Sequence, residues 1–295
     1  MVSSPEVNSP KLIDSIIKLL RWDKPAGRLI LMIPALWAVF FASDGNPPPI
    51  LVLIIILGTV ATSAAGCVIN DLWDRNIDDK VDRTKTRPLA SKALSVKVGI
   101  VVFFISLSCA AGLAFYLNTL SFWLCVLAVP FIVCYPLAKR VFPVPQFVLS
   151  LAWGFAVLIS WSAVTGDLTP NAWLLWGATV TWTMGFDTVY ALSDRPDDLK
   201  VGINSSAIFF GDLAGEAVGL FYALTAGLFA YLGIVNGLNI FYGLTWTIAV
   251  VMWSGQYIQL RLPQIKQGNV NFAKIFGQNV WIGFILLLGI IVGDR

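Results

Sequence analysis

Nine long apolar stretches run through this chain of 295 residues, and each is about as long as a helix that crosses a lipid bilayer. The apolar windows cover residues 25–43, 49–69, 98–117, 119–138, 146–165, 171–190, 207–235, 238–257 and 276–293. They are continuously apolar rather than alternating, which favours helices over a membrane β-barrel. Only 13% of the residues are charged, so a bilayer is the expected solvent. The sequence predicts an all-α, polytopic membrane protein with nine transmembrane helices.

The basic residues are distributed in a way that predicts the orientation of these helices. Nineteen of the 20 Lys and Arg residues lie near the N-terminus or after the second, fourth, sixth and eighth windows. The intervening connections contain none, and Arg295 alone follows the last window. Because positively charged loops are retained in the cytoplasm, we expect a cytoplasmic N-terminus and a C-terminus on the opposite side. A cytoplasmic segment at 1–24 then precedes a single transmembrane domain at 25–295.

An acidic cluster follows the second window on the side predicted to be cytoplasmic. Its sequence, NDLWDRNIDD, runs from Asn70 to Asp79. If the helix continues past the membrane surface, Asn70, Asp74 and Asp78 share one helix face at spacings of four, and Asp71 lies beside them.

A second acidic cluster, DTVYALSDRPDD, follows the sixth window on the same side and runs from Asp187 to Asp198. Tyr190, Asp194 and Asp198 repeat the spacing of four, and Asp187 lies one turn deeper. Pro196 is expected to break or bend the helix. The position of the two clusters suggests two similar halves, at about 25–138 and 146–257, followed by a last helix at 276–293.

Both clusters have the composition of a divalent-cation site. Carboxylates stacked at the C-terminus of a helix repel one another and oppose the helix dipole, and a bound cation removes both penalties. Oxygen ligands without sulfur or imidazole suit Mg²⁺, and the chain contains no histidine. Residues 74–78 also match the start of a calcium loop, but Asp79 and Lys85 stand where that loop needs Gly and Glu. A solvated acidic loop is the remaining alternative.

Longer stretches around the clusters resemble the signature regions of a known family. Ala64–Ala90 (AAGCVINDLWDRNIDDKVDRTKTRPLA) and Asp187–Gly211 (DTVYALSDRPDDLKVGINSSAIFFG) resemble the two motifs of the intramembrane aromatic prenyltransferases, the UbiA superfamily. RWDKPAG at Arg21–Gly27 and YPLAKR at Tyr135–Arg140 are similar to two further landmarks. Within the superfamily, the strongest resemblance is to the 4-hydroxybenzoate polyprenyltransferases.

The resemblance implies a reaction and its participants. A polyprenyl group would pass from a polyprenyl diphosphate to the ring carbon ortho to the hydroxyl of 4-hydroxybenzoate, in ubiquinone or plastoquinone biosynthesis. The cofactor would be Mg²⁺, the site would open to the cytoplasm of a bacterial inner membrane or its equivalent, and the partners would include membrane lipid but no nucleic acid.

The resemblance also implies roles for individual residues. The residues implied to hold the metal are Asn70, Asp71, Asp74, Asp78, Asp187, Asp194 and Asp198, of which Asn70, Asp74, Asp194 and Asp198 would be catalytic. Those implied to bind diphosphate are Arg83, Arg87, Lys139 and Arg140. Those implied to bind the acceptor are Arg28, Arg140, Tyr135 and Tyr190.

Two alternatives stay open at this point. One is a prenyltransferase of the same superfamily with another acceptor, such as homogentisate, chlorophyllide or haem, because metal motifs do not specify the acceptor. The other is a divalent-ion-linked transporter, which needs polar groups near the middle of the membrane. Glu216, which is expected to face the interior of the bundle, is the main residue in favour of a transporter.

Overall fold

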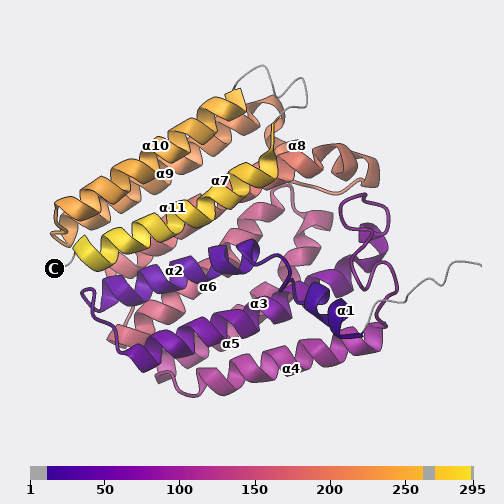
Figure 1. The fold of residues 1–295 in the computed structure, drawn as a ribbon, viewed down its shortest axis with the longest axis horizontal. Helices are drawn as coiled ribbons and strands as arrows, with labels where there is room; N and C mark the ends of the chain where they lie inside the picture. The colour runs from indigo at the N-terminus through magenta and orange to yellow at the C-terminus, as the bar shows by residue number, and fades with distance from the viewer. Residues whose placement is uncertain (1–11, 262–269, 294–295) are drawn as a thin grey trace, which may run out of the picture.

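A computed structural model of the chain describes residues 12–261 and 270–293, and these ranges contain helices and no strand. The helices are α1 (Leu12–Leu19), α2 (Ala26–Ala42), α3 (Pro49–Asp78), α4 (Val96–Ala114), α5 (Thr119–Val141), α6 (Pro145–Thr165), α7 (Pro170–Val201), α8 (Ser206–Phe210), α9 (Ala214–Val235), α10 (Ile240–Arg261) and α11 (Phe272–Gly293). The long helices lie side by side in one bundle (Figure 1). The prediction of an all-α protein is confirmed for the described residues.

Six segments in the described ranges are long and apolar enough to cross a membrane. They are Pro49–Asp78, Val96–Ala114, Thr119–Val141, Pro145–Thr165, Ser206–Val235 and Phe272–Gly293. The shorter helix α2 is also apolar, whereas α7 and α10 are long enough but do not reach the same combination of hydropathy and low charge. The chain is therefore an integral membrane protein.

The helices that carry the two acidic clusters extend well beyond their apolar windows. α3 continues to Asp78, as the spacing of its acidic residues predicts. α7 continues through Pro196, so the expectation of a break there is wrong. It ends at Gly202, which has a φ of 77° and donates its N–H to the carbonyl of Asp198. Pro196 removes one backbone hydrogen bond, but the packing of α7 against α6, α9 and α11 compensates for that loss. The helix ends instead at Gly202, because a left-handed glycine is a common helix C-terminus.

The largest buried cluster joins α2, α6, α7, α9, α10 and α11, and a buried polar network centred on Asn279 lies among these helices. Asn279 is fully buried, and its Oδ1 accepts hydrogen bonds from Trp182 Nε1 at 3.0 Å and Trp253 Nε1 at 3.1 Å. Its Nδ2 donates to the Tyr222 hydroxyl and to Gln256 Oε1, both at 3.2 Å. Both polar atoms of this side chain are paired, and the network joins α7, α9, α10 and α11.

One end of the bundle gathers the less regular parts of the chain. α1, the connection between α3 and α4, and α8 lie at this end, whereas α11 finishes at the opposite end (Figure 1). The predicted seventh window, 207–235, begins here as α8, is interrupted at Gly211, and continues as α9. This end of the molecule contains both acidic clusters.

Candidate functional site

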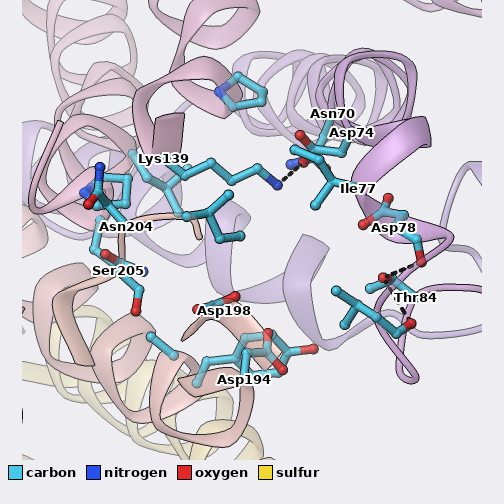
Figure 2. Close-up of a pocket in the computed structure, with 18 of the residues that line it drawn as sticks. Asn70, Asp74, Ile77, Asp78, Thr84, Lys139, Asp194, Asp198, Asn204 and Ser205 are labelled. Carbon is cyan, nitrogen blue, oxygen red and sulfur yellow. Dashed lines mark hydrogen bonds and ion pairs between the residues drawn. The ribbon is translucent and has the colours of Figure 1, made fainter. Parts of the chain in front are cut away.

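A polar cavity of about 240 Å³ lies where the ends of α3, α5 and α7 meet the connection after α3. Its lining includes Asn70, Asp74 and Asp78 from α3, Tyr135 and Lys139 from α5, Asp187, Tyr190, Asp194 and Asp198 from α7, and Arg83 and Arg87 from the connection. Asp74 and Asp78 lie across the cavity from Asp194 and Asp198 (Figure 2). Two motifs more than a hundred residues apart in sequence thus line the same space.

The first motif presents its polar atoms along one face of α3. Asn70 Nδ2 donates a hydrogen bond to the Tyr135 hydroxyl at 3.2 Å. The carboxylate of Asp74 is 1% exposed, and its Oδ2 accepts a hydrogen bond from the ammonium group of Lys139. Its Oδ1 is buried and accepts no hydrogen bond from the residues that the structure describes. Asp78 lies one turn further along the same face.

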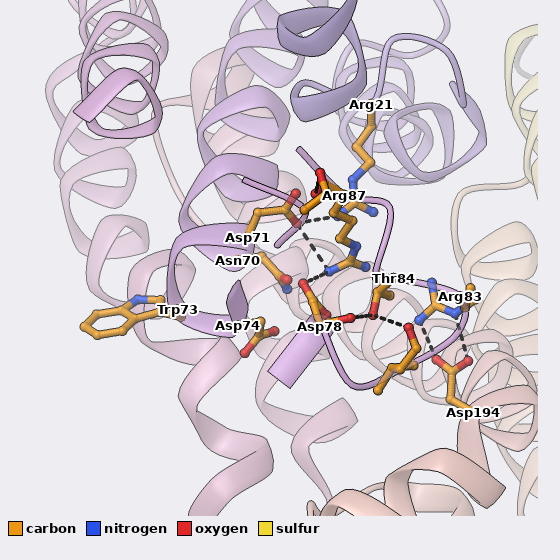
Figure 3. Close-up of polar contacts among 12 residues, drawn as sticks. Arg21, Asn70, Asp71, Trp73, Asp74, Asp78, Arg83, Thr84, Arg87 and Asp194 are labelled. Carbon is orange, nitrogen blue, oxygen red and sulfur yellow. Dashed lines mark hydrogen bonds and ion pairs between the residues drawn. The ribbon is translucent and has the colours of Figure 1, made fainter. Parts of the chain in front are cut away.

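Arg83, in the connection after α3, links that connection to the second motif on α7. Its guanidinium donates to both carboxylate oxygens of Asp194, from Nε at 2.8 Å and from Nη2 at 2.6 Å (Figure 3). Nη1 donates to the Tyr190 hydroxyl at 2.9 Å, and the group lies 4.9 Å from the centroid of that ring. Burial alone would lower the pKa of Arg83, but the hydrogen bonds with Asp194 and the proximity of Tyr190 raise it above its usual value. Arg83 therefore remains a cation.

Asp198, which lies beyond the apolar window of α7, is in an environment that disfavours its negative charge. Burial, with the nearby charge of Asp194, raises the pKa of the Asp198 carboxyl to about 6. A cation placed between these two carboxylates would reverse that shift, because an opposite charge stabilises the ionised form.

Asp71 is placed differently from the other acidic residues of its motif. Its carboxylate does not line the cavity; it accepts from Arg21 Nη2 at 2.6 Å and lies 3.3 Å from Arg87 Nη1. The same Arg87 nitrogen is 2.7 Å from Asp78 Oδ2, so one guanidinium joins two acidic residues (Figure 3). Arg21 was not assigned a role from the sequence, although it begins the RWDKPAG landmark.

Two of the predicted acceptor-binding residues also lie outside the cavity lining. Arg28 donates to the carbonyl of Leu20 at 2.6 Å and lies 5.7 Å from the centroid of the Trp22 ring. Arg140 donates from Nη2 to the carbonyl of Trp73 at 2.5 Å, and the same nitrogen lies 3.8 Å from Asp74 Oδ1. The structure brings Tyr135 and Tyr190 into the cavity but neither arginine.

Some cavity residues were missed by the sequence reasoning. Asn204 and Ser205 line the cavity from the segment after α7, and the backbone N–H of Asn204 donates to the carbonyl of Lys139 at 2.8 Å. Gln146, in the first turn of α6, lines it too, and its Oε1 accepts from the N–H of Ser206 at 2.7 Å. Asn204 and Ser205 fall within a quoted signature region, whereas nothing in the local sequence distinguishes Gln146.

Glu216 does not face the bundle interior, and that expectation is wrong. It lies in the first turn of α9 and forms an ion pair with Arg261 at the end of α10, with side-chain exposures of 37% and 52%. A partly exposed position next to a basic residue lowers the cost of the charge without any transport role.

The donor atoms of the cavity suit magnesium, although the carboxylates are now paired with basic side chains. In the described part of the chain no three His, Cys, Asp or Glu residues form a ready-made metal cluster. The ion pairs are Asp74 with Lys139, Asp78 with Arg87, and Asp194 with Arg83. Asp74 Oδ1 accepts no hydrogen bond from the described residues and lies 3.8 Å from Arg140 Nη2. This oxygen and an oxygen-only donor set fit Mg²⁺, which prefers carboxylate ligands and retains part of its water shell.

Residues 31–285 match the model of the UbiA prenyltransferase family. The chain therefore belongs to the UbiA prenyltransferase family. Membership of a prenyltransferase family argues against the transporter hypothesis. Glu216, the residue that favoured a transporter, is paired with Arg261.

Individual relatives are similar over nearly the whole chain. A 4-hydroxybenzoate solanesyltransferase of Synechocystis sp. is 65% identical over 286 residues, covering 97% of each chain. A 4-hydroxybenzoate octaprenyltransferase of Aromatoleum aromaticum is 39% identical, covering 94% of this chain and 92% of the relative.

Solved structures share the fold. The apo structure of a UbiA homologue from Aeropyrum pernix K1 has a TM-score of 0.78 at 24% identity, covering 90% of this chain and 97% of that one. A UbiA homologue from Archaeoglobus fulgidus bound to GPP and Mg²⁺ has a TM-score of 0.66 at 20% identity, covering 93% and 99%.

The position of Asp71 generates a prediction that separates it from Asp74. Asp71→Asn should lower the free energy of unfolding by about 2–3 kcal/mol, because it removes the charge that Arg21 and Arg87 share in a buried setting. The magnesium concentration for half-maximal prenyl transfer should stay unchanged, because Asp71 does not line the cavity. Denaturation in detergent and a magnesium titration measure the two effects.

Asp82→Asn is the matched control, because Asp82 pairs with Lys85 at the surface and is 87% exposed. Its free energy of unfolding should change by less than about 0.5 kcal/mol. Asp74→Asn, which alters a carboxylate that lines the cavity, should raise the magnesium concentration for half-maximal transfer. An equal rise in Asp71→Asn would contradict the separation.

Proposed function

We propose that this chain transfers a polyprenyl group from a polyprenyl diphosphate to the carbon ortho to the hydroxyl of 4-hydroxybenzoate. The products are 3-polyprenyl-4-hydroxybenzoate and diphosphate, in ubiquinone or plastoquinone biosynthesis. The observation that carries the proposal is that both acidic motifs, from α3 and α7, line one cavity together with basic side chains. The names of the similar relatives support the choice of acceptor.

In this proposal the cavity binds magnesium and diphosphate through separate sets of side chains. The metal-binding residues are Asn70, Asp74, Asp78, Asp187, Asp194 and Asp198. Bound Mg²⁺ supplies the positive charge that stabilises the departing diphosphate. Without such compensation the carboxylates would repel an anionic substrate.

The basic residues of the cavity are suited to the diphosphate oxygens. Arg83, Arg87 and Lys139 pair with the carboxylates of Asp194, Asp78 and Asp74, which would hold the metal ions. The guanidinium groups can then hold phosphate oxygens in forked hydrogen bonds. Arg140 stays in the proposal as a diphosphate-binding residue, because its Nη2 lies 3.8 Å from Oδ1 of Asp74, which lines the cavity. Arg28, which donates to the carbonyl of Leu20, has no contact with a cavity carboxylate among the described residues.

Two tyrosines can stabilise the positive charge that develops on the allylic carbon as the diphosphate leaves. The rings of Tyr135 and Tyr190 line the cavity, and each is held by a hydrogen bond, from Asn70 and from Arg83 respectively. The face of an aromatic ring attracts a cation, so these rings can stabilise the carbocation-like transition state.

The proposal includes an orientation in the membrane. The helices α2–α7 and α9–α11 supply nine spans, and the charge distribution favours a cytoplasmic N-terminus with the cavity opening to the cytoplasm. In a variant without native cysteines, an impermeant maleimide added to intact cells should label Asn46→Cys and leave Lys80→Cys unlabelled. Labelling in the reverse pattern would overturn the orientation.

The metal assignment predicts the effect of removing one carboxylate from each motif. Asp74→Ala and Asp194→Ala should each reduce magnesium-dependent transfer at least about 1,000-fold, because electrostatic stabilisation of the leaving group is lost. Both proteins should still insert into the membrane at wild-type levels, as checked by fractionation. Asp82→Ala should keep wild-type turnover. Near-wild-type turnover in either cavity variant would remove the metal assignment.

The acceptor assignment predicts the substrate of isolated membranes. Membranes containing this chain should prenylate 4-hydroxybenzoate with magnesium and several lengths of polyprenyl diphosphate, and membranes with Asp74→Ala should not. Radiolabelled acceptor followed by extraction of the lipid product measures the transfer. Prenylation of homogentisate, with no product from 4-hydroxybenzoate, would show that the acceptor assignment is wrong. The assignment of prenyl transfer would still hold.

A further inference from the structure

Gln146 lines the cavity without joining any of its charge pairs. The N–H of Ser206 donates to its Oε1 at 2.7 Å. A backbone N–H only donates, so this contact determines which end of the amide is oxygen and turns the NH₂ group away from Ser206. In the described ranges no residue accepts a hydrogen bond from Gln146 Nε2, and this atom is not among the buried unpartnered ones. The NH₂ group is thus an oriented donor with no protein partner.

On one side Gln146 meets the polar segment 204–206, and on α6 itself its neighbours are apolar. Pro145 precedes it, Leu149 lies three residues later on α6, and both line the cavity. Residues three apart are neighbours on a helix surface, so α6 presents one amide donor between apolar groups. Pro136 and Ile203 add further apolar lining.

This combination does not suit the diphosphate. The charged donors of the cavity, such as Arg83 and Lys139, lie next to the acidic motifs. A diphosphate gains most from those cations and from metal ions, and little from an apolar wall with one neutral donor. An aromatic ring that carries one or two oxygen substituents needs the opposite: apolar surface for the ring and a donor for the oxygen.

We propose that Gln146 donates a hydrogen bond from Nε2 to an oxygen substituent of the aromatic acceptor and thereby orients the ring against Pro145 and Leu149. This inference rests on the proposed function, since it names the part of the cavity that holds the acceptor. A fixed oxygen substituent determines which ring carbon faces the allylic carbon. Gln146 is therefore an acceptor-positioning residue.

The test compares two substitutions that differ in what they keep. Gln146→Glu retains an oxygen for the Ser206 N–H but loses the donor, whereas Gln146→Leu loses both. Each should raise the KM for 4-hydroxybenzoate by about tenfold, the effect of roughly 1.4 kcal/mol in binding. The KM for the polyprenyl diphosphate should change by less than about twofold. Asn46→Asp, the same amide-to-acid change in the exposed α2–α3 connection, should leave both constants at wild-type values.

Two inhibitors that lack one substituent identify the oxygen that Gln146 holds. If the partner is the carboxylate, benzoate should inhibit Gln146→Leu about tenfold less well than wild type, and phenol should inhibit both equally. If the partner is the hydroxyl, the pattern should be reversed. Either pattern supports the inference.

Three results would overturn it. One is an unchanged KM for 4-hydroxybenzoate in both variants. Another is a Gln146→Glu variant that behaves as wild type while Gln146→Leu is impaired, which would mean that Gln146 only tethers Ser206. The third is a rise in the KM for the diphosphate alone. Absence of 4-hydroxybenzoate turnover in the wild-type protein would instead overturn the proposed function.

Discussion

The fold around the cavity depends on the compensation of buried negative charge. The side chains of Asp71, Asp74 and Asp78 at the end of α3 are each at most 5% exposed. An unpaired carboxylate at such burial costs on the order of several kcal/mol, so basic side chains have to meet it. Arg87 comes from the connection after α3 and Lys139 from α5. Charge pairing thus determines where both segments lie.

The same requirement brings the two acidic motifs together. Without cations between them, the ends of α3 and α7 would face each other across the cavity with negative charge on both sides. Arg83 reaches from the connection after α3 to Asp194 on α7 and forms a forked pair with it. A diphosphate with its metal ions needs this mixture of groups, because carboxylates bind the metal ions and basic side chains bind the phosphate oxygens. The ion pairs in the structure and the site of the proposed reaction therefore use the same residues.

α7 combines this polar site with the stability of the bundle because its faces serve different purposes. One face presents Trp182 to Asn279, in the buried network that joins four helices. Gly185 lies against the ring of Tyr222, where a Cβ atom would approach to 2.5 Å, so only glycine permits this contact. Another face lines the cavity with Asp187, Tyr190, Ala191, Asp194 and Asp198. Packing that excludes water on one side holds the acidic residues in place on the other.

The sequence alone determined the class of fold and the position of the two motifs. Hydrophobic length and helical periodicity are local properties, and they placed Asn70, Asp74 and Asp78 on one face of a helix that extends past its apolar window. The break expected at Pro196 and the inward position expected for Glu216 were wrong, because packing and a partner in α10 outweighed local preference. The pairing of Arg21 with Asp71 and the position of Gln146 in the cavity lining were decided only by the tertiary structure. Such contacts join residues about fifty or more positions apart, and their distances follow from how the helices pack rather than from any local pattern.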